Sequence, residues 1–324
     1  MKPYAVSIIV PIYNVEKYIA KCATTLFEQD FDSIEYVFVN DCTPDNSMQV
    51  LQSVIEKYPN RKNDIKIINK PQNEGLGQAR KTGFESATGE YILHIDSDDW
   101  VELDMASSLY KKAKEDDADI VCCDYFINYE NKEIHHKENY EKAQINWLKA
   151  VLIDIIHSYV WNKMCRRSLY QNTTFPKFSY LEDCFISTQL FYFAKKISFI
   201  HKPLCHYRKF NASSLTCNNY SEKLSNDLKQ LSISMNNFFI NHNVDNEYKE
   251  YFYERILVPI ILAIKGNLNK KVNFICPEAN HIKYIFKNDS LSFITKLILA
   301  TAFFKMDFIP VFFKNIYKKL KGFK

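Results

Sequence analysis

Glycine and long apolar segments are both scarce in this chain. Only 6 of its 324 residues are Gly, and four of the six lie within fifteen residues, at positions 75, 77, 83 and 89. The longest uncharged apolar segment, Ile256 to Ile264, has nine residues and contains Pro259, whereas a membrane-spanning helix needs about 20. We therefore expect no transmembrane helix, and a close approach of the backbone around the glycine cluster.

The sequence also lacks the cysteine pattern of a disulfide framework. Its nine Cys are odd in number and scattered, and the adjacent pair Cys122 and Cys123 suits neither a usual disulfide nor a CxxC metal site. The apolar stretch before Pro11 is too short for a signal peptide, and no small-residue cleavage pattern follows it. We expect reduced thiols and a cytoplasmic location.

A strong charge of one sign is missing as well. The formal net charge at pH 7 is +4, and 25% of the residues are charged, which argues against a dedicated nucleic-acid binder. The charge is unevenly distributed, because residues 291–324 contain seven Lys and one Asp and carry +6. We therefore expect no nucleic-acid partner, and a basic tail on a body that is nearly neutral.

Short β-branched runs alternate with helical periodicity over the first 120 residues. The runs predict strands at residues 6–10, 36–39, 65–68 and 91–95, all apolar enough to be buried on both faces. Helices are predicted between them at residues 15–26, after Thr43 as the capping residue with Pro44 as the first helical residue, and at residues 76–87. This alternation predicts a Rossmann-like α/β fold, with a mostly parallel sheet flanked by helices.

The pattern changes in the second half of the chain. Polar residues 125–139 predict a loop or hairpin, and helices are expected at residues 147–156 and 183–194. Beyond Ser221 the periodicity is helical almost to the end. Since the chain is also long for a single core, we expect an α/β catalytic domain at residues 1–220 and a helical C-terminal region at residues 221–324.

The acidic tetrad Asp96-Ser97-Asp98-Asp99 directly follows the fourth predicted strand. Three carboxylates at such a position repel one another and lose hydration, so a positive group is expected to offset them. Asp oxygens are hard ligands that suit Mg²⁺ or Mn²⁺ and leave coordination positions for diphosphate oxygens. For an isolated acidic pair, the alternative is a solvated turn that caps the next helix.

Polar motifs follow two further strands. Pro11-Ile12-Tyr13-Asn14 follows the first strand and Asn40-Asp41 follows the second. Because the carboxyl ends of parallel strands lie at one edge of a sheet, these motifs and the tetrad should meet in one crevice. The segment GLGQAR at residues 75–80 is not a good dinucleotide fingerprint, because Arg80 replaces its third glycine and the turn follows the third strand.

Five segments in order resemble the family-2 glycosyltransferases of GT-A fold. They are VSIIVPIYN, VFVNDCTPDNS, NEGLGQARKTGFESATGEYILHIDSDDW, WNKMCRRSLY and LEDCFIS, and the resemblance covers about residues 4–216. It implies an inverting enzyme that moves a hexosyl or N-acetylhexosaminyl group from a nucleotide-diphosphate donor, usually a UDP-sugar, to an acceptor hydroxyl. It also implies a role in making cell-surface polysaccharide.

The resemblance assigns donor-side roles to individual residues. Pro11 and Tyr13 would line the base pocket, and Asp41 would accept a hydrogen bond from the base. Arg80 would help to hold the nucleotide. Viewed alone, Tyr13 could equally be a core residue and Arg80 an exposed ion pair.

The resemblance likewise assigns the metal and the diphosphate contacts. Asp98 would ligate Mn²⁺ or Mg²⁺, and Asp96 would contact the ribose or the metal. Segment 206–216 resembles a loop that closes over the donor. In that loop Arg208, Ser213 and Ser214 would contact the diphosphate, and His206 would be either a third metal ligand or a packing residue.

The acceptor side rests on Leu181-Glu182-Asp183. By resemblance Asp183 is the general base that takes the acceptor proton, and Glu182 orients it or helps to bind the acceptor. Without the other motifs, two acids at a helix start could simply compensate the helix dipole. Lys163 matches a basic position of the family near the acceptor.

The C-terminal segment has the pattern of an amphipathic helix. Large apolar residues share one face and lysines the opposite one, namely Phe312, Phe313, Ile316, Tyr317 and Leu320 against Lys314, Lys318 and Lys321. This pattern is typical of a helix on an anionic membrane, and equally of a helix packed on its own protein. Membrane contact would place the enzyme at the inner face of the membrane and would suit a lipid-linked carbohydrate acceptor.

Two rival functions remain. A nucleotidyltransferase also needs a metal and a nucleotide in an α/β crevice, but would want a basic phosphate-binding loop after the first strand, which Pro11-Ile12-Tyr13-Asn14 does not supply. A degenerate, non-catalytic family member would only bind a sugar nucleotide. The complete set Asp41, Asp96, Asp98 and Asp183 argues against such decay.

Overall fold

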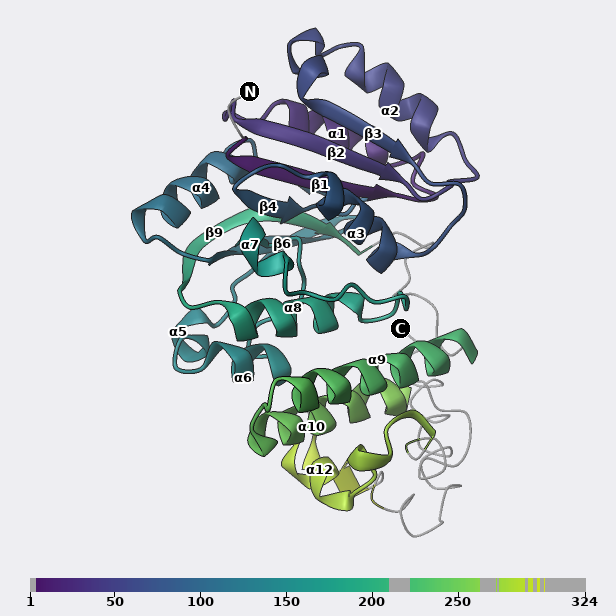
Figure 1. Ribbon diagram of the computed structural model, residues 1–324, viewed down its shortest axis with the longest axis vertical. Coiled ribbons are helices and arrows are strands. Elements are labelled where there is room, and N and C mark those ends of the chain that lie inside the picture. The colour runs from purple at the N-terminus through teal and green to yellow at the C-terminus, as the bar shows by residue number, and fades with distance from the viewer. Residues whose placement is uncertain are drawn as a thin grey trace. The chain divides into compact units, whose positions relative to one another are not determined.

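The computed structural model describes residues 4–209, 222–262, 272, 274–288, 291–293, 296–297 and 300. The chain forms two compact units, of which the first contains residues 1–151 and 155–214. The second contains residues 152–154 and 215–324. The first unit holds the sheet and the second is helical in its described part (Figure 1).

A nine-stranded mixed sheet lies within the described part of the first unit, in the order β3-β2-β1-β4-β8-β6-β9-β5, with β7 paired to β6. Its strands are β1 (Val6–Ile12), β2 (Ile34–Asn40), β3 (Ile65–Asn69), β4 (Tyr91–His94), β5 (Trp100–Val101), β6 (Ile120–Tyr129), β7 (Lys132–His136), β8 (Lys163–Arg166) and β9 (Ile197–Arg208). Strands β1 to β4 pair in parallel, whereas β8 is antiparallel to β4 and β6. The α/β class expected from the sequence is confirmed.

Helices cover both faces of this sheet (Figure 1). They are α1 (Ile19–Phe27), α2 (Ser47–Ile55), α3 (Leu76–Ser86), α4 (Met105–Glu115), α5 (Tyr140–Ala143), α6 (Trp147–Leu152), α7 (Arg167–Tyr170) and α8 (Glu182–Phe193), with a 3₁₀ turn, η1, at Pro59–Asp64. On α1 the buried residues Ile19, Cys22, Ala23 and Leu26 recur at helical spacing, so one face of the helix packs on the sheet.

Alternate residues of the central strands enter two separate cores. Ile8 and Val10 of β1 pack in one cluster with residues of α1 and α4, whereas Ile9 packs in the other with Ala79 of α3 and Ile186 of α8. This alternation is the expected consequence of a two-residue repeat in a sheet covered on both sides. It confirms the prediction that these strands are buried on both faces.

Three local predictions are wrong. The third strand is an edge strand and only half buried, because it pairs with β2 alone in the described sheet. Helix α2 begins at Ser47, so Thr43 does not cap a helix that starts at Pro44. Residues 206–208 belong to strand β9, which the sequence analysis did not predict, and not to a loop.

The second unit is built from helices α9 (Glu222–Asn241), α10 (Asn246–Leu262) and α12 (Ile282–Lys287), with a 3₁₀ turn, η3, at Pro277–Ala279. Helices α9 and α10 pack through Phe239 and Phe252, whose ring centroids are 5.9 Å apart. The expected helical character is confirmed for the described residues. None of the described helices has the length and apolarity needed to cross a membrane. The amphipathic segment 312–321 lies outside the described residues.

Candidate active site

The ends of β1 and β2 lie side by side and are tied together. The two strands pair in parallel with Ile12 opposite Asn40, and the Asp41 amide donates to the Ile12 carbonyl at 3.0 Å. The Asn14 amide donates to Thr43 Oγ1 at 2.8 Å, which is the role that Thr43 has in place of a helix cap. Side by side, these two strand ends form the wall where the base pocket was predicted.

Two predicted base-pocket residues differ in exposure on this wall. Pro11 is buried within β1, while the Tyr13 side chain is 48% exposed just beyond it. The alternative of Tyr13 as a core residue is therefore wrong. An exposed aromatic ring at the carboxyl edge of the sheet is available to stack on a planar base.

Asp41 holds the glycine-containing loop that opens α3. Its two carboxylate oxygens accept hydrogen bonds from the amides of Glu74 and Gly75 at 3.0 and 2.9 Å, and Lys70 Nζ lies 3.3 Å away. Gly75 has a φ of +87°, a conformation that side chains disfavour, and a Cβ there would come within 2.8 Å of Ser179 Oγ. A hydrogen bond from a base to Asp41 would therefore come in addition to the two amide hydrogen bonds that its carboxylate already accepts.

Arg80 joins the acidic tetrad to the acceptor-side acids. From α3, its buried guanidinium donates through Nη2 to Asp96 Oδ1 at 2.7 Å and through Nε to Glu182 Oε1 at 3.1 Å. Burial opposes the charge, but the two carboxylates raise the pKa of Arg80 above its ordinary value. Its Nη1 has no hydrogen-bond partner among the described residues. The alternative of an exposed ion pair at Arg80 is wrong.

The three carboxylates of the tetrad have different surroundings. Asp99 is buried, and its Oδ1 accepts the amide of Arg208 at 2.7 Å. Burial, reinforced by the charges of Asp98 and Asp96, raises the pKa of Asp99 well above its ordinary value. Asp96 and Asp98 are partly exposed, so they are the tetrad side chains that a metal can reach from solvent.

Two cationic and two aromatic side chains lie beside the tetrad. Arg208 Nε donates to the Asp98 carbonyl at 2.8 Å, and its guanidinium lies 4.8 Å from the ring centroids of Tyr18 and Trp100. Lys21 Nζ lies 3.2 Å from the Trp100 ring. Arg208 was predicted from the sequence, whereas Lys21 was missed. Ser213 and Ser214, the other predicted diphosphate contacts, lie outside the described residues.

Glu182 and Asp183 occupy the first turn of α8. The helix follows Leu181, which has the left-handed backbone of φ 59° and ψ 30°. Glu182 is 4% exposed, and burial together with the charge of Asp183 raises its pKa to about 8, although Arg80 lowers it in part. Asp183 is partly exposed and accepts the Cys184 amide at 2.7 Å.

A carboxyl group with a pKa near neutrality can exchange a proton under working conditions. The sequence analysis gave Glu182 an orienting or acceptor-binding role, because the burial that raises its pKa leaves no trace in the local sequence. The structure therefore adds a second titratable candidate beside the predicted base Asp183.

Two other predicted residues are engaged in the fold. His206 is buried, with Nε2 2.7 Å from Glu102 Oε1 and Nδ1 3.1 Å from Glu133 Oε2, so a metal role would require it to release one of these. Lys163 donates through Nζ to the carbonyls of His157 and Tyr159 and to Asn162 Oδ1. It orders the segment before β8.

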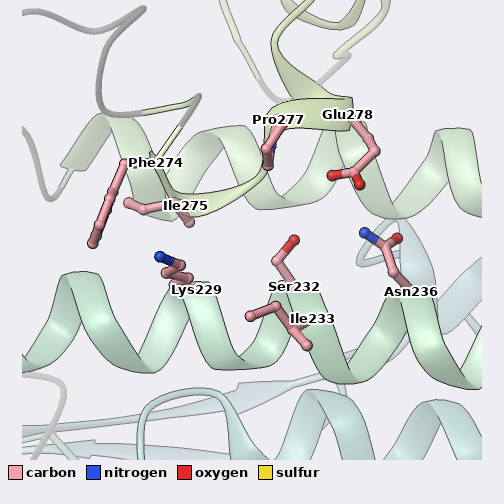
Figure 2. A pocket seen from close by; sticks show the side chains of 8 residues that line it. All are labelled: Lys229, Ser232, Ile233, Asn236, Phe274, Ile275, Pro277 and Glu278. Carbon is pink, nitrogen blue, oxygen red and sulfur yellow. The ribbon is translucent and has the colours of Figure 1, made fainter.

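A cavity of about 390 Å³ is lined entirely by residues of the second unit (Figure 2). It lies between α9 and the segment around η3, with Lys229 Nζ 4.2 Å from the Phe274 ring centroid. The remaining lining residues are Ser232, Ile233, Asn236, Ile275, Pro277 and Glu278. None of the predicted site residues lines this cavity.

Comparison with known proteins places the site in context. A family model described as "Glycosyl transferase family 2" matches residues 7–191. The "Putative glycosyltransferase EpsH" of Bacillus subtilis is 34% identical over 234 residues, which cover 69% of this chain and 66% of that protein. The matched region contains the strand-end motifs, the tetrad and the Glu182-Asp183 pair.

Two solved structures share the fold. Staphylococcus aureus TarS 1-349 in complex with UDP superposes with a TM-score of 0.64 at 20% identity, covering 85% of this chain and 82% of that one. The mannosyltransferase PcManGT from Pyrobaculum calidifontis, in complex with GDP-Man and Mn²⁺, superposes with a TM-score of 0.54 at 15% identity, covering 93% and 88%. At these identities the likeness concerns the fold.

Proposed function

This chain belongs to glycosyl transferase family 2, and from that premise we propose a metal-dependent, inverting enzyme that moves a hexosyl or N-acetylhexosaminyl group from a UDP-sugar to an acceptor hydroxyl. The observation that carries the proposal is the pair of hydrogen bonds from Arg80 to Asp96 and Glu182. Through Arg80, the acids suited to a metal and a diphosphate lie next to the acids suited to a proton transfer.

The donor side supports a nucleotide with a diphosphate. Exposed Tyr13 is available to the base, and Asp41 stands beside it at the end of β2. Arg208, with Lys21 behind Trp100, supplies positive charge next to the tetrad. The UDP seen in S. aureus TarS supports uracil as the base. Ser213 and Ser214 stay in the proposal as further diphosphate contacts.

The residues of the tetrad fit a hard divalent cation. Asp98 and Asp96 offer partly exposed carboxylates, and oxygen donors of this kind suit Mn²⁺ or Mg²⁺. When bound, the ion would offset the charge that develops on the departing diphosphate. The Mn²⁺ in PcManGT supports this assignment. His206 stays in the proposal as a further metal ligand, although both of its ring nitrogens contact glutamates, Glu102 and Glu133.

The acceptor side must remove a proton from the attacking hydroxyl. We assign this to Asp183, which is more exposed than Glu182 and stands at the start of α8. Glu182, fixed by Arg80, orients that turn and helps to bind the acceptor. Inversion follows when the hydroxyl attacks the anomeric carbon on the face opposite to the leaving diphosphate.

For the acceptor we propose only a chemical class, and for the location only a face of the membrane. A carbohydrate or lipid-linked acceptor of cell-surface polysaccharide synthesis, used at the cytoplasmic face of the membrane, suits the basic tail. Residues 1–220 would carry catalysis and residues 221–324 would serve acceptor or membrane contact. Co-sedimentation with anionic vesicles tests the tail, since equal pelleting of the full chain and residues 1–290 would contradict it.

The nucleotidyltransferase hypothesis gains no support, because Tyr13 and Asn14, directly after β1, supply no basic side chain and the matching family is a glycosyltransferase family. A thermal-shift screen of nucleotide sugars with and without Mn²⁺ tests the proposal. A ligand at 100 times its Kd adds about 2.7 kcal/mol of stability, which is readily measured. We expect UDP and a UDP-sugar to stabilise the protein only with metal. Equal effects of UDP, GDP and ADP would exclude the uracil assignment.

A further inference from the structure

Two histidines and a glutamate come together in the first unit, and none of them is among the residues proposed for catalysis. His136 ends β7, Glu138 lies just before α5, and His157 belongs to the segment before β8. One ligand atom from each side chain lies within 4.8 Å of those of the other two. Among the described residues, these three are brought together from separate elements of the fold.

The distances between the ligand atoms are close to those between the ligands of a bound zinc ion. His157 Nδ1 lies 3.0 Å from Glu138 Oε1, and His136 Nε2 lies 4.0 Å from Glu138 Oε2. Two ligands each about 2.1 Å from a tetrahedral zinc ion are about 3.4 Å apart. The two observed distances lie on either side of this value, so small rotations of the side chains bring all three ligands into range.

Among the described residues, no Lys or Arg forms an ion pair with Glu138. Its side chain is 1% exposed, and its hydrogen bonds come from the amide and the ring of His157. The charge of Lys163 acts on Glu138 from nearby. However, its three N–H donors form hydrogen bonds with His157 O, Tyr159 O and Asn162 Oδ1. A buried carboxylate is costly unless a cation or hydrogen bonds offset it, and a metal ion would do so.

Neighbouring groups orient both imidazoles. The Tyr125 ring stacks on His136 with centroids 4.7 Å apart, whereas the Tyr125 hydroxyl, 3.1 Å from His157 Nδ1, would give up that nitrogen to the ion. The His157 ring stacks on the Tyr159 ring, with centroids 5.0 Å apart and an interplanar angle of 2°. The Glu138 amide donates to buried Asp124. Such supporting contacts hold metal ligands in place and are a regular part of metal sites in proteins.

We propose that His136, Glu138 and His157 bind a divalent transition metal, with zinc as the expected ion. Two imidazoles and one carboxylate suit Zn²⁺, whereas the all-oxygen tetrad suits Mg²⁺ or Mn²⁺. The two histidine side chains are 32% and 35% exposed, so an ion can reach the cluster from solvent.

The ion would fasten the β6–β7 hairpin to the segment before β8. That segment carries Tyr159 and Trp161, whose stacked rings continue to Tyr207, the residue before Arg208. The metal site would therefore fix the position of an aromatic row that runs to the proposed diphosphate side. Its existence does not depend on the proposed transfer reaction.

Calorimetry with Zn²⁺ on the full-length, chelator-treated protein tests the site. Wild type and Asp98→Ala should each bind one equivalent with the same affinity, because Asp98 belongs to the other site. His136→Gln and His157→Gln should each weaken Zn²⁺ binding at least about tenfold. His242→Gln, which alters an exposed histidine just after α9 that contacts Phe238, is the control and should bind as wild type does.

Two further readouts keep the test decisive. Co²⁺ in the same site should give the visible absorption of a tetrahedral ion in wild type and Asp98→Ala. This absorption should be absent in His136→Gln and in His157→Gln. Circular dichroism establishes that each variant is folded. If folded His136→Gln and His157→Gln bind Zn²⁺ as tightly as wild type, or if Asp98→Ala alone removes binding, the cluster is a hydrogen-bonded His-Glu-His network and the proposal is wrong.

Discussion

The Arg80 guanidinium contacts one member of each of two acidic pairs, and the surroundings of the pairs differ. Asp96 and Asp98, after β4, are partly exposed, whereas Glu182 at the start of α8 is buried and has a pKa of about 8. The same cation contacts both pairs, so the raised pKa of Glu182 comes first from burial and next from the charge of Asp183. The exposed pair can take up a hard cation, and the buried end of the other pair is suited to holding or moving a proton.

Removal of the metal-binding carboxylate should have the largest effect. Asp98→Ala should lower sugar transfer by about 10³-fold or more, since a bound ion contributes several kcal/mol to the transition state. Donor affinity should fall together with turnover, because the ion belongs to the bound donor as well. Calorimetric titration with UDP and Mn²⁺, alongside a UDP-release assay, measures both. Metal-independent UDP binding in wild type would break the assignment.

Removal of the shared cation should cost stability. Arg80→Met leaves Asp96 and Glu182 without their buried partner, and breaking a buried pair in this way costs about 3–5 kcal/mol. Urea unfolding measures the loss. The neighbouring Lys81→Met removes an exposed i,i+4 pair with Glu85 and should change stability by less than about 0.5 kcal/mol. Equal losses in both variants would mean that Arg80 does not hold the two pairs together.

Glu182 should make stability depend on pH. Below its ordinary pKa of 4.5 the group is protonated whether the chain is folded or unfolded. Between pH 4.5 and about 8 only the unfolded chain loses the proton, so the unfolding free energy should fall as pH rises and level off above 8. Relative to Glu182→Gln, wild type should lose at least about 1 kcal/mol across this window. A constant difference between pH 5 and pH 9 would mean that Glu182 is ionised throughout.

The smallest effect is expected at Asp99, within the same tetrad as Asp98. Asp99→Asn keeps an oxygen for the Arg208 amide and removes a carboxyl whose pKa is already raised by burial. Stability should change by less than about 1 kcal/mol and Mn²⁺ affinity by less than about threefold. Titration of Mn²⁺ into Asp99→Asn and Asp98→Asn compares the two positions directly. A larger loss at Asp99 would reverse their assigned roles.

Local patterns were enough to predict much of the fold. The first four strands and α3 were correctly predicted, because a run of apolar residues and a 3.6-residue repeat are properties of the sequence itself. The meeting of the Asp41 and Pro11-Asn14 motifs followed from the rule that parallel strands share a carboxyl edge. Strand β9 was missed, since its exposed His201 and Lys202 interrupt the apolar pattern.

Contacts between residues far apart in the sequence could not be predicted from local patterns. The Arg80 to Glu182 bond joins residues 102 positions apart, and no local pattern indicates it. The raised pKa of Glu182 depends on burial by the tertiary fold. Likewise, the glutamates that engage His206 come from two other segments of the chain, so the sequence could offer only two alternatives for that residue.

Single-turnover transfer by Asp183→Asn tests the division between the two acidic pairs most directly. The rate as a function of protein concentration, in excess over labelled UDP-sugar with Mn²⁺ and acceptor, yields both the donor Kd and the transfer rate. Asn keeps the volume of Asp183 and removes the base, so the donor Kd should stay within about threefold while transfer falls about 10²- to 10⁴-fold. Transfer near the wild-type rate would contradict the account and would move the base to Glu182.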